Sequence, residues 1–168
     1  ELEDRIRQII EEEMERRSGS NRILNLTPEQ KLLGSNFLQN KGRLPWPVER
    51  GMITGNFGQI PVEGAPGVMI NNNGVDISCP AGSTARALFD GEVTSVFAIL
   101  GANYAIIIMH GEYLTVYQNL VDLKVKVGDI VTTKQALGTV HTDGDIAVLH
   151  MQVWKSKEIL DPTHWISR

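Results

Sequence analysis

Residues 90–117, DGEVTSVFAILGANYAIIIMHGEYLTVY, decide the fold. This stretch contains three short runs of apolar, β-branched and aromatic residues, which favour β-strands. Turn-forming pairs, Asp90-Gly91 and His110-Gly111, bound two of these runs, so neighbouring strands are expected to reverse direction there. The three runs are Val93–Leu100, Tyr104–Met109 and Tyr113–Tyr117.

The same pattern of short runs and tight turns extends on both sides of this stretch, from residue 44 onwards. No helix is expected after Gly42, apart from a turn near Pro162–Trp165. Short strands at regular spacing predict a mainly β domain, an antiparallel β-sandwich or barrel. The further runs are Val125–Val131 and Val148–Val153, and the further turns are Asn73-Gly74, Pro80-Ala81-Gly82, Gly128-Asp129 and Asp143-Gly144.

The N-terminal 43 residues have a different, helical pattern. In residues 1–17 apolar side chains recur at three- and four-residue steps, and Glu–Arg pairs four residues apart support a helix. Two interpretations remain open for it: the end of a coiled coil, or an ordinary amphipathic helix on the domain. The apolar positions are Leu2, Ile6, Ile9, Ile10 and Met14.

Residues 18–43 are expected to form a linker followed by a second helix. Thr27 can cap the helix N-terminus, Pro28 fits its first position, and Gln30 completes a capping box. Gly42 fits the C-terminal cap. The predicted organisation is therefore an amphipathic helix at 1–17, a linker and second helix at 18–43, and a β domain at 44–168.

Composition excludes several classes of protein. The chain has 168 residues, a net charge of −4 and a pI near 5.6, which argues against a nucleic-acid-binding protein. One cysteine, Cys79, permits neither an internal disulfide nor a multi-cysteine zinc site. No phosphate-binding loop, dinucleotide fingerprint or nucleophile elbow is present.

The four histidines are the other candidates for chemistry. No histidine is paired at close spacing with another histidine or with cysteine, as zinc sites on one element prefer. His110 and His141 are expected in turns, whereas His150 lies on a predicted strand that can face a groove. Asp76 follows the turn at Asn73, and capping that turn is its simplest role.

From Leu44 to Trp165 the order of motifs resembles the LytM/lysostaphin-type zinc peptidase domain, which cleaves cross-links in bacterial peptidoglycan. The resemblance implies the fold of that family. The matching motifs are Pro47 to Gly58 with Gly55 and Phe57-Gly58, Asn72 to Asp76, Pro80-Ala81-Gly82, Asp90 to Val93, Tyr117 to Leu120, Val127 to Val131 with Gly138, Val148 to Gln152, and Asp161 to Trp165.

The departures from the family pattern bear on activity. The resemblance places the zinc ligands of active members at Asn72, Asp76 and His150, and the two catalytic histidines at Asn119 and Val148. Three of these five positions therefore carry a different residue. An Asn is a poor zinc ligand, and neither Asn119 nor Val148 can transfer a proton near neutral pH. We expect no tightly bound zinc, no other cofactor and no peptidase activity.

A site without catalysis can still bind a partner. The resemblance implies a partner-binding groove lined by Asn72, Asp76, Tyr117, Asn119, His150 and Gln152. Domains of this kind that follow a coiled coil resemble the EnvC-type activators, which bind and activate cell-wall amidases in division and couple to a membrane division complex through the coiled coil. This type also implies a periplasmic location, which rests on the resemblance alone because no secretory signal is recognised. The second helix, Pro28–Lys41, either covers the groove or docks on the sandwich.

Three alternatives remain open. The chain is a passive peptidoglycan-binding or scaffold module, or a residual zinc endopeptidase that uses Asn72 as an unusual ligand. Residues 125–140 also resemble part of a biotinyl or lipoyl carrier domain, although the modified lysine of such carriers is missing.

Overall fold

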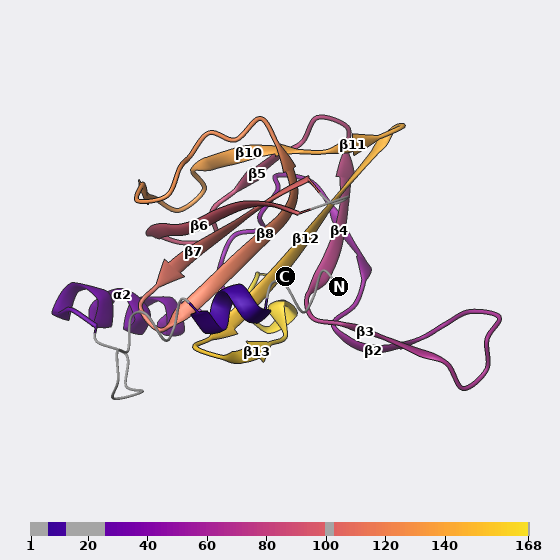
Figure 1. The fold of residues 1–168 in the computed structure, drawn as a ribbon, viewed down its shortest axis with the longest axis horizontal. Helices are drawn as coiled ribbons and strands as arrows, with labels where there is room; N and C mark the ends of the chain where they lie inside the picture. The colour runs from indigo at the N-terminus through magenta and orange to yellow at the C-terminus, as the bar shows by residue number, and fades with distance from the viewer. Residues whose placement is uncertain (1–6, 13–25, 100–102, 168) are drawn as a thin grey trace.

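The computed structural model describes residues 7–12, 26–99 and 103–167. In this part of the chain, eleven strands form one curled antiparallel sheet, and two further strands form a separate hairpin (Figure 1). The strands of the sheet are β1 (Met52–Gly55), β4 (Val75–Pro80), β5 (Thr84–Arg86), β6 (Gly91–Ile99), β7 (Asn103–His110), β8 (Tyr113–Val121), β9 (Ile130–Val131), β10 (Ala136–Val140), β11 (Thr142–Asp143), β12 (Ile146–Lys155) and β13 (Glu158–Leu160). The hairpin consists of β2 (Gly58–Pro61) and β3 (Met69–Asn72).

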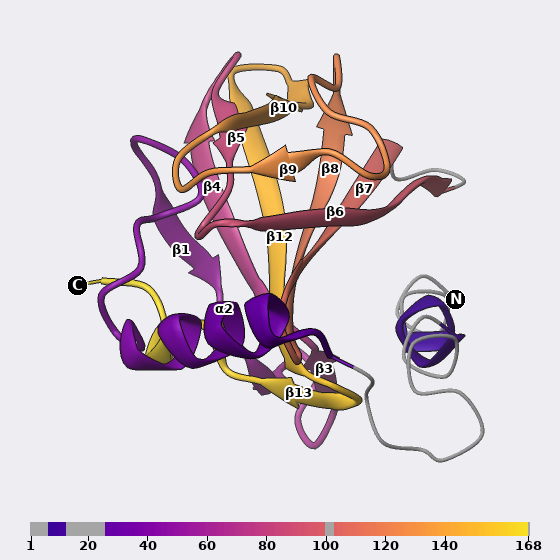
Figure 2. The same ribbon diagram turned by 90° about the vertical axis from the view of Figure 1, so that its left-hand side faces the viewer.

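The decisive stretch behaves as predicted. Its three runs form β6, β7 and β8, which are neighbours in the strand order β1-β4-β12-β8-β7-β6-β9. The β7–β8 turn lies at residues 111–112, where Gly111 has the positive φ of +70° that the turn requires. β10 pairs with both β5 and β8, so this part of the sheet folds over its own inner face (Figure 2). The expected mainly β, antiparallel sandwich or barrel is confirmed.

One predicted strand is largely wrong. Of residues 125–131 only the last two are in a strand, β9. The segment before them is a turn, because Gly128 has a φ of +97° and the Asp129 carboxylate accepts a hydrogen bond from the Lys126 N–H at 3.0 Å. Val127 is 57% exposed, so the apolar run that suggested a strand does not enter the core.

Two apolar clusters lie on opposite faces of the sheet. The inner cluster joins β4, β7, β8 and β12 to the folded-over strands, with fully buried side chains such as Ile77, Ile106 and Leu149. The outer cluster contains Trp154 of β12, Leu114 and Val116 of β8, Ala105, Ile107 and Met109 of β7, and Ile10 from the helical segment 7–12. Side chains of one strand alternate between these faces, which is why both clusters draw on β7, β8 and β12.

Helix α2 (Pro28–Gln39) begins with the predicted capping box. The Thr27 hydroxyl accepts from the Gln30 N–H at 3.1 Å, and the Gln30 side chain accepts from the Thr27 N–H at 2.9 Å. The helix ends two residues earlier than Gly42 suggests, with Asn40 as its C-cap. Phe37 anchors it in the inner cluster, stacked on the rings of His110, Tyr113 and Trp165.

The segment 7–12 is helical, as predicted for this part of residues 1–17. Ile10 is fully buried in the outer cluster, and the Arg7 guanidinium lies 5.1 Å from the centre of the Trp154 ring. The rest of the predicted first helix, at 1–6 and 13–17, and the break at 18–21 lie outside the described residues. Among the described helices, none has the length and apolarity that crossing a membrane requires.

The start of the β domain is fastened to its C-terminal end. Leu44 and Ile166 form an isolated parallel bridge, and the Ser167 N–H donates to the Leu44 carbonyl at 2.8 Å. The Trp46 indole N–H donates to the Ser167 carbonyl at 2.7 Å. The short 3₁₀ helix Pro162–His164 precedes this clasp, in the place where a turn was predicted.

The sequence predicts His110 in a turn, and the structure places it elsewhere. It is the last residue of β7 and is fully buried. Its Nδ1 lies 2.7 Å from the Asp90 carbonyl oxygen, so Nδ1 carries the proton, and Nε2 lies 2.9 Å from the Thr115 hydroxyl. His110 also stacks on Phe37 of α2 and so helps to hold this helix to the sheet. It takes no part in the candidate site.

Candidate functional site

The candidate site lies on the outer face of β4, β12 and β8. The register pairs His150 of β12 with Asp76 of β4 on one side and with Gln118 of β8 on the other. Directly paired residues share a face, and so do alternate residues along β12. We call this surface the site face; it carries Asp76, Ser78, Gln118, Val148, His150 and Gln152.

Asp76 and His150 come together as the resemblance implied. The His150 Nδ1–H donates to the Asp76 Oδ1 at 2.8 Å. The Asp76 side chain is 38% exposed and that of His150 is 18% exposed. Asp76 does not cap the turn at Asn73, because the Gly74 N–H donates instead to the Asn72 Oδ1 at 3.3 Å.

Asn72 approaches this pair from the end of β3. Its Nδ2 donates to the Asn56 carbonyl at 3.0 Å and lies 3.3 Å from the Asp76 Oδ2. The carbonyl of Asn56 can only accept and the N–H of Gly74 can only donate, so these two neighbours fix which end of the Asn72 amide faces Asp76. An N–H group, with no lone pair for a cation, therefore points at the carboxylate.

Behind His150 a hydrogen-bonded chain runs along β12 to the outer cluster. The Trp154 indole N–H donates to the Gln152 Oε1 at 2.8 Å, and the Gln152 Nε2 lies 3.1 Å from the His150 Nε2. An indole N–H only donates, so it fixes the Gln152 amide with its NH₂ group toward the imidazole. His150 Nε2 must then accept, and the neutral, Nδ1-protonated imidazole satisfies both neighbours.

This series of hydrogen bonds uses both ring nitrogens of His150. A proton on Nε2 would face the amide NH₂ of Gln152, and turning that amide would break its bond to Trp154. Gln152 is itself fully buried, so either change leaves an unpaired polar group away from water. Gln152 was predicted to line a groove; it supports His150 from behind instead.

The Asn119 side chain links β8 to its two neighbouring strands. Its backbone has a φ of 75°, a conformation that Asn tolerates better than most residues. Its Nδ2 donates to the Val148 carbonyl at 2.8 Å, and its Oδ1 accepts from the Asn103 Nδ2 at 2.9 Å. Both ends of the amide are used in holding β8 to β12 and to β7.

Tyr117 does not line the site, which corrects the prediction. Its side chain is fully buried in the inner cluster, where the hydroxyl accepts from the Leu88 N–H at 3.0 Å. Burial raises the pKa of Tyr117 to about 12. Alternation along β8 turns Tyr117 inward and its neighbour Gln118 to the site face.

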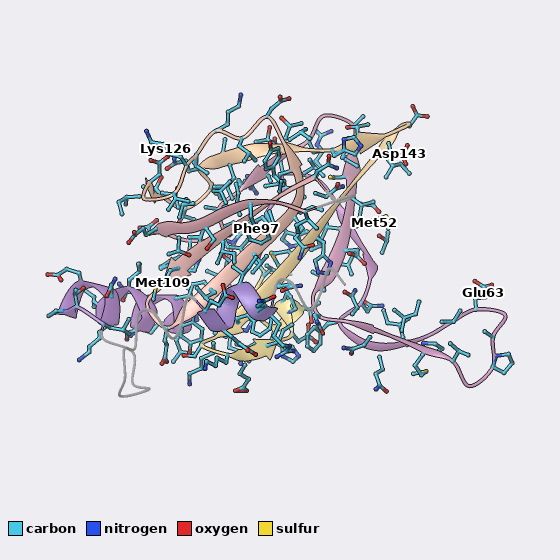
Figure 3. All side chains as sticks on the ribbon, viewed as in Figure 1. Met52, Glu63, Phe97, Met109, Lys126 and Asp143 are labelled. Atoms are coloured by element: carbon cyan, nitrogen blue, oxygen red, sulfur yellow. The ribbon has the colours of Figure 1, made fainter. Side chains whose placement is uncertain are left out.

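The sequence reasoning missed Ser78 and Gln118 of the site face, and Ile146 and Met52 beside it. Gln118 is only 3% exposed, and its side chain makes no hydrogen bond among the residues that the structure describes. Ile146 is two residues from Val148 along β12 and Met52 pairs with Ser78; they are 55% and 64% exposed (Figure 3 labels Met52). Alternate residues of a strand share a face, so Ile146 could have been placed on the same face as Val148 from the sequence alone. Met52 could not, because the sequence does not show that β1 pairs with β4.

Comparisons with known proteins identify the family of this chain. Residues 70–162, more than half of the chain, match peptidase family M23. The chain belongs to peptidase family M23.

The relatives are distant and longer. An uncharacterized metalloprotease of Buchnera aphidicola subsp. Baizongia pistaciae (strain Bp) is 29% identical over 100 residues, which are 58% of this chain and 27% of that protein. The solved structure of Helicobacter pylori Csd3 is similar with a TM-score of 0.65 and 25% identity, over 74% of this chain and 35% of that one. The chain thus spans about a quarter to a third of these proteins.

The fold itself recurs more widely. The structure of the SpoIIQ–SpoIIIAH pore-forming complex contains a chain that matches with a TM-score of 0.60 at 17% identity, over 76% of this chain and 92% of that one. At this identity the likeness concerns the fold alone.

The residues of the site do not fit the zinc ion of the family. In the described residues no three His, Cys, Asp or Glu side chains converge. Asp76 and His150 bond to each other through the atoms that a metal would need, and Asn72 presents an N–H group. A catalytic zinc site takes three protein ligands and leaves a fourth position for water, which this donor set does not supply.

Proposed function

We propose that this chain is a non-catalytic member of its family that binds a peptidoglycan amidase and activates it during cell-wall remodelling at division. The observation that carries the proposal is the closed hydrogen-bond network at Asn72, Asp76, His150 and Gln152. It occupies the place where the sequence resemblance locates the metal, and it needs no metal to be satisfied.

Two further features argue against peptide hydrolysis. Val148 and Asn119 stand where the resemblance places the catalytic histidines. A valine has no proton to transfer, and both ends of the Asn119 amide are already bonded to Val148 and Asn103. General acid–base catalysis typically contributes a factor of ~10²–10⁴, so losing it together with the metal removes the basis for turnover.

The surroundings of Val148 favour a protein partner. Val148 is 36% exposed, and Ile146 and Met52 on the same face are more exposed still, with Ser78 between Val148 and Met52. Neighbouring apolar side chains on a surface commonly mark protein-binding sites. A surface that activated water would need polar groups at this position.

The finer parts of the proposal follow from the same resemblance. The partner is an N-acetylmuramoyl-L-alanine amidase, the chain acts in the periplasm, and helical residues N-terminal to the domain connect it to a membrane division complex. Direct binding to peptidoglycan is the competing function.

Release of dye from labelled peptidoglycan tests the proposal. One arm contains this chain, one an autoinhibited division amidase of the same organism, and one contains both. Release only in the mixture above the amidase level supports activation. Release by the chain alone would establish a residual zinc endopeptidase, and no release in any arm, with sedimentation on insoluble wall, would establish a passive wall-binding module.

A metal titration tests the interpretation of the site separately. Asn72→His supplies the third ligand of the family pattern, so zinc affinity should rise by at least about 10–100-fold over the native chain, the range that is lost when a residue that only orients a metal ligand is removed. Competition with a chromophoric chelator measures this. Asn72→Gln is the matched control and should bind as weakly as the native chain. Tight zinc binding by the native chain would contradict the network described above.

A further inference from the structure

The hairpin β2–β3 projects from the body of the protein as an arm. We define the arm as residues 58–72; Figure 1 shows it extending away from the sheet, and Figure 3 shows Glu63 at its far end. It forms its own two-stranded sheet. A two-stranded hairpin is marginally stable alone in water, so an arm that belongs to neither apolar cluster of the described residues calls for an explanation.

The arm is nevertheless well formed. Its register pairs Ile60 with Ile70 and Pro61 with Met69, and it continues beyond the strands, where the Val62 N–H donates to the Val68 carbonyl at 3.0 Å. The tip closes with two glycines at positive φ, Gly64 at +80° and Gly67 at +82°. The arm is therefore a regular hairpin whose side chains lie on two defined faces.

Apart from Asn72 at its base, one face of the arm is apolar. Paired residues share a face and alternate residues along a strand share it too, so Ile60, Val62, Val68 and Ile70 lie together. We call these four side chains the apolar arm face. Val68 is 50% exposed and Ile70 is 58% exposed.

Apart from Asn72, the polar side chains of the arm's two strands are on the other face. Gln59 and Asn71 pair there, next to Met69, which is 48% exposed. Glu63 is the one charged residue in residues 58–72. Between Gln59 and Asn71 the arm thus has one face without any hydrogen-bonding side chain and one mixed face.

The apolar arm face is continuous with the site face. Asn72, the last residue of β3, has the same strand phase as Ile70 and Val68, and its amide reaches Asp76. At the other side of Asp76 the site face continues into Val148 and Ile146. Exposed apolar side chains therefore flank the hydrogen-bonded site on two sides.

We propose that the apolar arm face is a docking surface for apolar side chains of a protein partner, which also contacts the site face. This inference rests on the proposed function and identifies its partner as the amidase polypeptide, not the cell-wall polymer. Glycan strands and their peptides are recognised largely through hydroxyl and amide groups, for which this face offers no hydrogen-bonding side chain. Pro61 lacks an N–H and weakens the edge of β2 as a template for an added strand, so the face and not the edge is the contact.

The test compares two faces of the same strand in the full chain. The double variant Val68→Thr/Ile70→Thr keeps β-branched residues but makes the apolar arm face polar. Met69→Thr makes a similar change at similar exposure on the other face. Both variants should keep the thermal unfolding of the native chain, because the arm belongs to neither apolar cluster.

Affinity for the amidase, measured by calorimetry, should fall at least about tenfold in the double variant and change less than about twofold in Met69→Thr. Amide hydrogen exchange in residues 58–72 of the native chain should slow when the amidase is added. Equal affinities for both variants, or unchanged exchange in the arm, would overturn the inference while leaving the proposed function standing.

Two other outcomes are distinct. If the native chain does not bind the amidase, the proposed function fails, and the inference that rests on it fails with it. If the double variant loses sedimentation with insoluble cell wall but keeps its amidase affinity, the arm binds polymer and the inference is wrong.

Discussion

At the residue scale, three amide side chains complete the hydrogen bonds of the candidate site. Asn72 has both ends fixed by neighbours that can only accept or only donate, the Asn56 carbonyl and the Gly74 N–H. Asn119 and Gln152 each have one such neighbour, the Val148 carbonyl and the Trp154 indole N–H. Turning one of these amides would break that bond, so each amide keeps one orientation.

A second feature at the residue scale, the burial of His110, affects the stability of the protein in acid. Burial lowers the pKa of His110 from 6.5 to about 4, although the nearby Asp90 opposes this shift. The unfolded chain thus takes up a proton at higher pH than the folded chain does. The stability that neutral His110 contributes is complete above pH 6.5 and is lost progressively as the pH falls toward 4.

Urea unfolding between about pH 7 and pH 4.5 should show this loss, which amounts to roughly 3 kcal/mol at the acid limit for a shift of this size. His110→Gln removes the titrating group. This variant should be less stable than the native chain at neutral pH but should lose less stability on acidification. The same pH dependence in both proteins would show that other groups cause it.

Part of the site could be predicted from the sequence and part could not. Motif order was enough to bring Asp76 and His150 together, since both lie on strands whose pairing the family resemblance implies. Tyr117 was assigned to the site because it stands in a motif, whereas the alternation along β8 points it inward. Asn72, Asn119 and Gln152 were assigned to the site, but their hydrogen bonds could not be predicted because their partners, such as Asn56 for Asn72 and Asn103 for Asn119, are set by the tertiary fold.

At the element scale, helix α2 and the β7–β8 turn depend on close backbone contact. A Cβ added at Gly111 would lie 2.6 Å from the Gln30 carbonyl oxygen and 2.7 Å from the Gly34 Cα. Gly111 also has a φ of +70°. Backbone atoms on both sides cannot move aside as a flexible side chain would, so α2 must shift if this residue is enlarged.

Gly111→Ala is therefore expected to destabilise the protein by roughly 2–4 kcal/mol, the sum of a left-handed alanine and an overpacked contact. Gly144→Ala is the matched control, because Gly144 has a φ of +67° with no atom within 4 Å of the added Cβ. The control should cost only about 1 kcal/mol. Urea unfolding of the two variants measures the difference, and equal costs would mean that α2 does not rest on this contact.

The strands themselves were easier to predict than their ends. β6, β7, β8 and β12 were recognised because each carries a continuous apolar run that two clusters bury. Residues 125–131 carry a similar run but bury little of it, because a turn closed by Asp129 takes up most of the segment. Local hydrophobicity does not distinguish these cases; the presence of a neighbouring strand does.

At the scale of the whole molecule, the helical segment 7–12 and the candidate site share one face of the sheet. Val148, His150, Gln152 and Trp154 alternate along β12 on this face, and Trp154 packs against Ile10. Helix α2, in contrast, inserts Phe37 into the inner cluster at the end of the sheet (Figure 2). Of these two helical segments, 7–12 lies on the face of the sheet that carries the site, and α2 does not.

Two deletions distinguish the contribution of the segment 7–12 from that of helix α2. Removing residues 1–25 should leave a folded domain and strengthen amidase binding, because the outer cluster and the site face become accessible together. Removing residues 1–43 also takes Phe37 out of the core and should lower the stability by several kcal/mol, at least the ~3–5 kcal/mol of a Phe→Ala change. Calorimetric titration with the amidase and urea unfolding give the two readouts.

Ile10→Asp in the full chain is the smaller test of the same idea, since it removes the apolar anchor without shortening the protein. Its amidase affinity should move toward that of the 1–25 deletion. An affinity that stays at the native value in both proteins would mean that the segment 7–12 only covers apolar surface.

The clasp between Leu44 and Ile166 has a mechanical consequence. Tension applied through the N-terminal helices reaches the β domain at Leu44, where backbone bonds to Trp165 and Ser167 and the Trp46 indole bond share the load. These contacts are sheared together instead of being opened one after another. A pull from that side would therefore be carried into the C-terminal segment before it reached β1, and the strands that hold Asp76 and His150 would keep their register under load.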